Sequence, residues 1–325
     1  MFAGIDIGGT NIKAGVIDAG GELLWSDSHP TDAARGKDAL IEDIQSVMGR
    51  TLAAYPKLQS VGVGFPSVVH PDGSVHHPPN LPGWGVVPLR DILQSALPVP
   101  VAIDNDANVA ALAESELGAG ASASHFLYVT LGTGVGGGII INKRIYSGER
   151  GGAGEIGHII VDANDAPTAQ QVSEGRAFRA GTLEELVGRP GLLAMARHMM
   201  AEYPDSLLHS YGNELDVEQI SEATAAGDPC AEACFRRAGY VLGVGIAGAL
   251  AMLDMRIVVV GGGISKAHPL LLDTTLATLR SRALPTIAHE VELRLAQFST
   301  NAGIIGAALL GKGMTQDRTT FIAGE

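Results

Sequence analysis

The stretch GIDIGGTNIKAG, Gly4–Gly15, decides how the rest of the chain is interpreted. It places two adjacent glycines and a threonine in a turn between two short apolar runs. Asn, Asp and Gly favour such hairpin turns for conformational reasons alone. The same turn can present bare backbone N–H groups, one hydroxyl and one cation to a phosphate. The other segments of the sequence have to distinguish a plain hairpin from a phosphate-binding turn.

Length, charge and hydrophobicity limit the classes of protein to which the chain can belong. Its 325 residues, 46% of them hydrophobic, suffice for two domains with packed cores. The net charge of −13 argues against a nucleic-acid partner, since polyanions need basic patches. No signal peptide is recognisable, and the most apolar run, Val241–Leu253, is shorter than the roughly 20 residues that span a bilayer. We expect a cytoplasmic protein with no membrane partner.

Apolar periodicity predicts two α/β halves that each open with a Gly-turn hairpin. The first half begins βββαβα and continues with one more strand and helix: the strands lie at 2–8, 12–19, 22–30, 60–69 and 98–104, and the helices lie at 38–55, near 89–97 and at 108–118. A similar order begins again at His125. We therefore expect a smaller domain over 1–118 and a larger one over 119–301, with a C-terminal helix at about 302–325 that joins the first domain.

Three further glycine clusters stand out in a chain whose 43 glycines are nearly twice the usual share of about 7%. GTGVGG, Gly132–Gly137, has dinucleotide-binding spacing but leads into a β-branched strand, where that motif requires a helix. GAALLGK, Gly306–Lys312, resembles a P-loop but lacks the following Ser or Thr and consists of helix formers. VVVGGGIS, Val258–Ser265, leaves room for a nucleobase against bare backbone.

These clusters, taken together, resemble known motifs. DIGGTNIK, LGTGVGGG, VVVGGGIS and NAGIIGAAL resemble the nucleotide-binding motifs of the actin-like ATPase superfamily. GFPSVV, NLPGW, IDNDANVAALAE, GERGGAGEIGH and GTLEE resemble the ROK family of bacterial sugar kinases and related repressors. The resemblance covers the whole chain in order. It implies an α/β actin-like ATPase (ribonuclease H-like) fold, with two βββαβα-type domains around a cleft.

The resemblance implies roles for residues on the ATP side. Two phosphate turns and an adenosine-side motif would contact the nucleotide: Gly8, Gly9 and Thr10; Gly132, Thr133 and Gly134; Gly262 and Gly263. Asp6 would help to position Mg²⁺ through water. Lys13 would either approach a phosphate or face solvent as a strand residue.

On the sugar side the resemblance implies a set of hydrogen-bonding residues, namely Asn80, Asn105, Asp106, Glu155, His158 and Glu184. Asp106 would be the catalytic base. At the start of a helix its ionised form is favoured by the helix dipole. Such a carboxylate can take the proton of a primary hydroxyl that attacks the γ-phosphorus, although an Asp there can equally be a plain N-cap.

The chain departs from the family pattern after GEIGH. Most members continue with a C-x-C-G-x-x-G-C loop, whose thiolates and the motif histidine hold a structural zinc. Residues 161–185 contain no cysteine, and Thr182 stands where the last one would fall, so no zinc is expected. We hypothesise that polar groups in Asp162–Glu174 or ordered water hold His158 instead. Cys230 and Cys234 are expected in a helix core, and His70, His76 and His77 in a solvated loop.

The leading hypothesis is an ATP- and Mg²⁺-dependent kinase of the hexose 6-hydroxyl, a glucokinase first. Fructose, mannose and N-acetylhexosamines stay open as acceptors. Inorganic polyphosphate is an alternative donor, against which the acidic charge argues mildly. A ROK-type sugar-sensing regulator is the non-enzymatic alternative, although DIGGT begins so close to the N-terminus that no helix-turn-helix domain is expected before it. A homodimer is implied by the resemblance alone.

Overall fold

The computed structural model describes residues 1–8, 11–30, 35–78, 81, 83–298, 300–315 and 321–323. The chain divides into two compact units. Unit 1 comprises Met1–His125, Gly138–Gly154 and the described residues from Gln297 onward. Unit 2 comprises Phe126–Gly137 and Glu155–Ala296.

Unit 1 is built on a five-stranded sheet of order β3-β2-β1-β4-β7. Strands β1, β2 and β3 form the predicted antiparallel meander, and β4 and β7 follow in parallel. The strand bounds are β1 Phe2–Ile7, β2 Asn11–Ile17, β3 Leu23–Pro30, β4 Val61–Phe65 and β7 Val101–Asn105. Its helices are α1 Lys37–Ala54, α2 Leu89–Ser95, α3 Asp106–Leu117 and α11 Ala302–Thr315. Two short strands, β5 Val75–His76 and β6 Val86–Val87, pair in antiparallel fashion as a separate two-stranded sheet.

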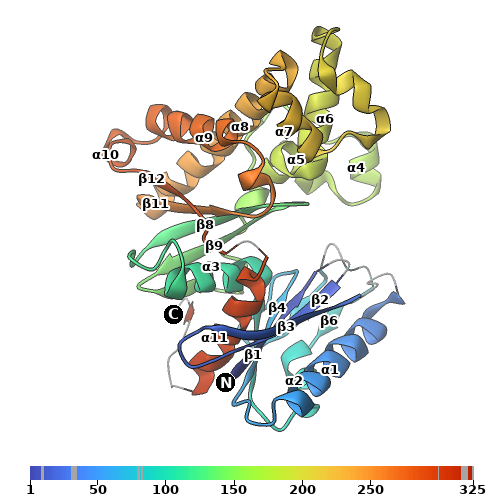
Figure 1. The fold of residues 1–325 in the computed structure, drawn as a ribbon, viewed down its shortest axis with the longest axis vertical. Helices are drawn as coiled ribbons and strands as arrows, with labels where there is room; N and C mark the ends of the chain where they lie inside the picture. The colour runs from blue at the N-terminus through green and yellow to red at the C-terminus, as the bar shows by residue number, and fades with distance from the viewer. Residues whose placement is uncertain are drawn as a thin grey trace. The chain divides into compact units, whose positions relative to one another are not determined.

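Alternation along β1 separates the two faces of this sheet. Ile5 and Ile7 belong to the same buried cluster as Leu40 and Ile44 of α1. Gly4 points to the opposite face, where α11 lies across the strands (Figure 1). Because side chains in a strand alternate with a period of two, Asp6 shares the α11 face with Gly4.

Helix α11 approaches the sheet so closely that only glycine fits beneath it. A β-carbon added at Gly4 would lie 1.9 Å from the carbonyl oxygen of Ile304, and one at Gly62 would lie 1.7 Å from that of Ala307. Gly306 makes the same kind of contact with α3, since its added β-carbon would lie 1.7 Å from the carbonyl oxygen of Val109. Backbone contact at these points therefore fixes α11 against both the sheet and α3.

The helix predicted for about 302–325 is shorter than expected. It ends at Thr315, and Phe321–Ala323 form β13, which pairs in parallel with β10, Arg144–Gly148. Aromatic and β-branched residues such as Phe321 and Ile322 favour a strand over a helix, which explains the difference.

Unit 2 contains three parallel strands in the order β12-β11-β8. These are β8 Phe126–Leu131, β11 Ile257–Gly261 and β12 Glu292–Leu295. Its α-helices are α4 Ala169–Ser173, α5 Leu183–Val187, α6 Arg189–Met199, α7 Val217–Ala225, α8 Pro229–Leu253, α9 Pro269–Arg282 and α10 Pro285–Ala288. Its 3₁₀ turns are η2 Ile156–His158, η3 Ala177–Arg179, η4 Met200–Glu202, η5 Leu207–Glu214 and η6 Ile264–Lys266.

The structure confirms several local predictions. The apolar run Val241–Leu253 is the C-terminal half of α8, and both cysteines are buried in the same helix. The turn after Leu131 leads into strand β9, Val135–Ile141, and Gly306–Lys312 lie within α11, so neither is a dinucleotide or P-loop motif. None of the described helices is long and apolar enough to cross a membrane.

One segment clusters differently from the expected division of the chain. Gly138–Gly154, expected within 119–301, belongs to unit 1. Contact with α3 explains this, since a β-carbon added at Gly138 would lie 2.8 Å from the side chain of Ala111. The chain therefore passes from unit 2 to unit 1 within β9.

A buried carboxyl group lies beneath the junction of β7 and α3. Asp104 Oδ1 accepts hydrogen bonds from the backbone N–H of Asn105, at 2.7 Å, and from the side-chain amide of Asn108, at 2.9 Å. Burial raises the pKa of Asp104 to about 6, against the opposing effect of both hydrogen bonds. Asn108 Oδ1 is buried without a hydrogen-bond partner among the described residues.

Replacing Gly62 by Ala tests the close approach of α11. We expect Gly62→Ala to lower the free energy of unfolding by about 3 kcal/mol, the upper end of overpacking costs, because the added methyl group meets backbone that cannot move aside. Gly49→Ala in α1 is the matched control, since its methyl group meets nothing within 4 Å and should stabilise by about 1 kcal/mol. Urea unfolding measures both, and equal stability of the two variants would contradict the contact.

Asp104→Asn tests the buried carboxyl group through the pH dependence of stability. The folded protein holds the proton more tightly than the unfolded chain, because the pKa of Asp104 is about 6 when folded, against an ordinary value of 3.8. The stabilising contribution is therefore full below pH 4 and is lost as the pH rises through 6, by about 3 kcal/mol in total. Between pH 4 and pH 7, the free energy of unfolding measured in urea should decrease less for the variant than for the wild type. Identical pH profiles would refute this account.

Candidate functional site

Asp6 lies at the end of β1, enclosed between β2 and the first turn of α11. It pairs with Lys13 across the β1–β2 register. A β-carbon added at Gly303 of α11 would lie 2.4 Å from Asp6 Cγ, so glycine is required there. Burial raises the pKa of Asp6, and the charge of Lys13 partly offsets this effect. The result is a partly buried carboxyl group at the edge of the sheet.

The turn after Asp6 is closed by a backbone hydrogen bond. The N–H of Gly8 donates to the carbonyl oxygen of Asn11 at 2.9 Å. Gly9 and Thr10, also predicted for this turn, lie outside the described residues. Lys13 Nζ lies 3.5 Å from the carbonyl oxygen of Thr300, which places its ammonium group beside backbone as well as near Asp6.

The predicted base, Asp106, is the first residue of α3, directly after β7. The N-cap of this helix is Asn105, whose Oδ1 accepts hydrogen bonds from the N–H groups of Ala107 and Asn108. The N-cap alternative for Asp106 is therefore wrong, since the preceding side chain caps the helix, although Asp106 Oδ1 also accepts from the Ala107 N–H at 2.8 Å. Asn105 Nδ2 donates to the carbonyl oxygen of Ser67 at 3.2 Å.

Gly64 in β4 brings Asp6 and Asp106 to the same place in unit 1. A β-carbon added at Gly64 would lie 3.8 Å from Asp6 Oδ1 and 3.6 Å from Asp106 Cα. Both acidic residues thus border one glycine at the carboxyl ends of parallel strands β1, β4 and β7. Ligands of open α/β sheets bind at this end of the strands.

In unit 2, two glycine turns meet at the end of β8. The first turn, Gly132–Gly134, is closed by a 2.9 Å hydrogen bond from the N–H of Gly132 to the carbonyl oxygen of Gly134. The second contains Gly262, whose φ of +83° favours glycine and whose added β-carbon would lie 2.2 Å from the carbonyl oxygen of Leu131. The predicted phosphate and adenosine motifs are therefore neighbours.

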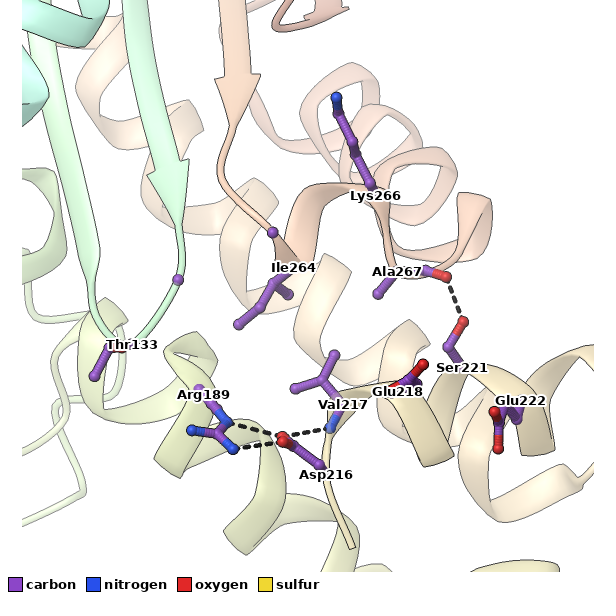
Figure 2. A pocket seen from close by; sticks show the side chains of 12 residues that line it. Thr133, Arg189, Asp216, Val217, Glu218, Ser221, Glu222, Ile264, Lys266 and Ala267 are labelled. Atoms are coloured by element: carbon purple, nitrogen blue, oxygen red, sulfur yellow. Dashed lines mark hydrogen bonds and ion pairs between the residues drawn. The ribbon is translucent and has the colours of Figure 1, made fainter. Parts of the chain in front are cut away.

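A pocket of about 590 Å³ opens beside these turns. Residues from both turns and from α6, α7 and η6 line it: Gly132, Thr133, Arg189, Asp216, Val217, Glu218, Ser221, Glu222, Gly263, Ile264, Lys266 and Ala267. Figure 2 shows Arg189 and Asp216 joined by two hydrogen bonds, of which Nε to Oδ1 measures 2.8 Å. The volume of the pocket falls within the usual range for small-molecule sites.

The charges of this pocket are mostly acidic. The acidic residues Asp216, Glu218 and Glu222 line it together with the cationic residues Arg189 and Lys266. The Arg189 guanidinium lowers the pKa of Asp216, so this pair stays ionised. Sequence reasoning missed all five side chains, because four of them come from segments that carry no motif and Lys266 lies one residue beyond VVVGGGIS.

Glu155 and His158 lie at the two ends of the 3₁₀ turn η2. Glu155 Oε2 is 4.0 Å from His158 Nε2. Burial raises the pKa of Glu155, the His158 charge opposes this rise, and the Glu184 charge adds to it. Three predicted sugar-side residues of unit 2 thus interact electrostatically.

Glu184, at the start of α5, uses both carboxylate oxygens. Oε2 accepts a hydrogen bond from the backbone N–H of Val135 at 3.0 Å, directly after the Gly132–Gly134 turn. Oε1 pairs with Arg179 Nη1 at 2.8 Å. Asn80, the remaining predicted sugar ligand, lies outside the described residues.

The segment after η2 does not fit a zinc ion. It has no cysteine between His158 and Glu184, and the described part of the chain contains no group of three or more His, Cys, Asp or Glu residues placed to hold a metal. The ring of His158 instead packs on the ring of Phe178, with centroids 5.8 Å apart. Thr182, at the position of the last expected cysteine, caps α5 and donates from Oγ1 to the carbonyl oxygen of Arg179.

Known proteins resemble this chain over nearly its full length. A glucokinase of Halalkalibacterium halodurans is 34% identical over 320 residues, which cover 96% of this chain and 94% of the relative. An N-acetyl-D-glucosamine kinase of Yersinia pseudotuberculosis is 32% identical over 95% of this chain and 98% of its own length. The crystal structure of a ROK family glucokinase from Streptomyces griseus, in complex with glucose and AMPPNP, matches with a TM-score of 0.80 and 30% identity, covering 96% of this chain and 99% of that one.

The family assignment agrees with these likenesses and extends across both units. The family model described as ROK family matches residues 2–314. The fold class inferred from the glycine motifs, that of the actin-like ATPase kinases, is confirmed by the likeness to the Streptomyces griseus structure. The chain belongs to the ROK family.

Proposed function

We propose that this protein transfers the γ-phosphoryl group of ATP to the 6-hydroxyl group of a hexose, with glucose as the preferred acceptor. The observation that carries the proposal is the position of Asp106, at the first turn of α3 and beside the same glycine as Asp6. The glucokinase and N-acetyl-D-glucosamine kinase relatives support a hexose as the acceptor.

Asp106 acts as the base in this proposal. Its carboxylate orients the sugar hydroxyl toward the γ-phosphorus and accepts the hydroxyl proton as the new O–P bond forms and the bond to ADP breaks. Because the transition state is loose, orientation contributes more than early proton removal. Holding the reactants in line can lower the barrier by about 7 to 11 kcal/mol.

On the acceptor side, Asn80, Asn105, Glu155, His158 and Glu184 bind sugar hydroxyls in this proposal. The side-chain amide of Asn105 has a second hydrogen for this role, since Nδ2 donates one hydrogen bond to Ser67 while Oδ1 caps α3. Burial raises the pKa of Glu155, which makes its carboxylate a stronger hydrogen-bond acceptor for a sugar hydroxyl than an exposed carboxylate.

On the donor side, the pocket of unit 2 takes the adenosine of ATP. Gly132, Thr133 and Gly134, with Gly8, Gly9 and Thr10, bind the phosphates, and Gly262 and Gly263 lie against the nucleoside. Three carboxylates among five charged lining residues disfavour a further stretch of polyanion there, so ATP fits better than polyphosphate. The AMPPNP complex of the Streptomyces griseus relative supports the same donor.

Asp6 offers the oxygen ligand that a hard cation such as Mg²⁺ prefers. Its partly buried carboxyl group would hold the ion through water, with Lys13 beside it. When bound, Mg²⁺ neutralises charge on the ATP phosphates. We propose in addition that the protein is cytoplasmic, forms a homodimer and does not bind nucleic acid. Light scattering measures the oligomeric state, and a DNA-binding assay measures nucleic-acid binding.

Asp106→Asn should lower kcat for glucose phosphorylation by about 10² to 10⁴, the usual contribution of a general base, with little change in the KM for ATP. A coupled ADP-release assay across glucose, mannose, fructose and N-acetylglucosamine measures this. Asp91→Asn, an exposed position in α2, is the control and should leave kcat unchanged. Full activity of Asp106→Asn would refute its role, and no activity of the wild type on any sugar would favour the sugar-sensing alternative.

Gly263→Leu tests the donor pocket. Gly263 has an ordinary φ of −62°, and a β-carbon there meets nothing within 4 Å, so the larger side chain enters the pocket without backbone strain. The KM for ATP should rise by about tenfold or more, while the KM for glucose stays within a factor of about two. Gly248→Leu in α8 is the control, since it also meets open space but lies outside the pocket. An unchanged KM for ATP would place the nucleotide elsewhere.

A further inference from the structure

The structure offers an alternative to a metal for holding the sugar-side residues of unit 2. The segment between η2 and α5 carries no zinc ligand set among its described residues, yet His158 and Glu184 both lie in fixed contacts. Among the described residues, the hydrogen bonds of the Asp162–Glu174 side chains do not reach His158, which speaks against polar groups there holding it, while ordered water, the other part of the hypothesis, stays a prediction. His158 and Glu184 instead contact Phe178 and Arg179, respectively, which both belong to the short turn η3.

Arg179, at the end of η3, is the centre of this arrangement. Its Nη1 lies 2.8 Å from Glu184 Oε1 and 3.9 Å from Glu185 Oε1. Its side chain is only 17% exposed, which sets it apart from the surface ion pairs of the chain. Charge-assisted hydrogen bonds gain strength in such partly buried positions, because water competes less for the charges.

Phe178 connects the same arginine to His158. The Arg179 guanidinium lies over the Phe178 ring, 5.7 Å from its centroid. That ring also contacts the imidazole of His158, at 5.8 Å and an interplanar angle of 41°. Phe178 is 51% exposed, so burial alone does not account for its position. One cation thus contacts a ring that in turn contacts the histidine.

The second carboxylate oxygen of Glu184 extends this arrangement to the phosphate side. Oε2 accepts from the N–H of Val135, and a β-carbon added at Gly134 would lie 2.2 Å from the same oxygen. The carboxylate therefore fits against the glycine turn that is proposed to bind phosphate. A shift of Glu184 would displace both a sugar ligand and that turn.

We propose that Arg179 is a positioning residue for phosphoryl transfer, fixing Glu184 directly and His158 through Phe178 in place of a structural metal. This inference rests on the proposed function of the same site. Arg179 does not contact the reacting atoms. It keeps Glu184, His158 and the Gly132–Gly134 turn in fixed positions relative to one another.

The test compares Arg179→Met with Arg179→Lys and wild type in steady-state kinetics with glucose and ATP. Loss of the guanidinium should lower kcat/KM for glucose by at least about tenfold in Arg179→Met, mostly through KM. Arg179→Lys should recover only part of this loss, since an ammonium group lacks the planar fork. Arg176→Met is the matched control: its partner Glu174 lies in the same segment, but the pair is exposed, and kcat/KM should not change.

Chemical rescue separates positioning from a general loss of structure. Millimolar methylguanidinium should restore part of the kcat/KM of Arg179→Ala, and methylammonium should restore less. A fall in kcat/KM without any rescue, or wild-type kinetics in Arg179→Met, would overturn the inference. If the Arg179 variants do not fold, Phe178→Ala decides: a raised KM for glucose supports the inference and an unchanged KM overturns it. A wild type without hexose kinase activity would refute the proposed function itself.

Discussion

Unit 1 depends on direct backbone contact between α11 and the sheet. Gly4 and Gly62 allow the carbonyl groups of Ile304 and Ala307 to lie where side chains would otherwise be. The same approach brings Gly303 against Asp6, and Gly64 leaves room between Asp6 and Asp106. A single constraint, the glycines at positions 4, 62 and 64 of β1 and β4, therefore determines how closely α11 and α3 approach the two acidic residues of the proposed reaction.

In unit 2, the carboxylate of Glu184 brings the proposed site residues together. Glu184 accepts a hydrogen bond from Val135, directly after the first glycine turn, and it lies against Gly157 of η2, where an added β-carbon would lie 3.4 Å from Glu184 Cβ. The second glycine turn reaches the same place through the contact of Gly262 with Leu131. Backbone groups of the two glycine turns thus form the surface proposed for the phosphates and one side of the pocket proposed for the nucleoside. Charged residues line other parts of that pocket, where Arg189 and Asp216 form an ion pair.

The fold was more predictable from the sequence than the site. Strand alternation and helical periodicity are local signals, so the β1–β2–β3 meander, α1 and the buried helix α8 follow directly from them. The glycine clusters also indicated which turns matter. The end of α11 at Thr315 was missed, although the aromatic and β-branched residues of β13 favour a strand over a longer helix. The N-cap of α3 was ambiguous, since Asn105 and Asp106 are both good capping residues and only the backbone angles distinguish them.

The residues that sequence reasoning missed are those brought together by tertiary structure. Arg189, Asp216 and Lys266 lie far apart in the chain and line one pocket only because α6, α7 and η6 pack around it (Figure 2). The sequence contained no direct indication of a role for Arg179. It showed only that no cysteine lies between His158 and Glu184. The sequence does not show which side chains of this segment contact Glu184, so Arg179 could not be identified as the residue proposed to replace a metal.

The central claim is that this protein transfers the γ-phosphoryl group of ATP to a sugar hydroxyl group. A time course of ³¹P NMR spectra with purified protein, glucose, ATP and Mg²⁺ tests it most directly. The account predicts that the γ-phosphorus resonance of ATP disappears as ADP and a single sugar phosphomonoester appear in equal amounts, coupled to the protons on C6. Release of inorganic phosphate alone, or an unchanged ATP spectrum, would contradict it.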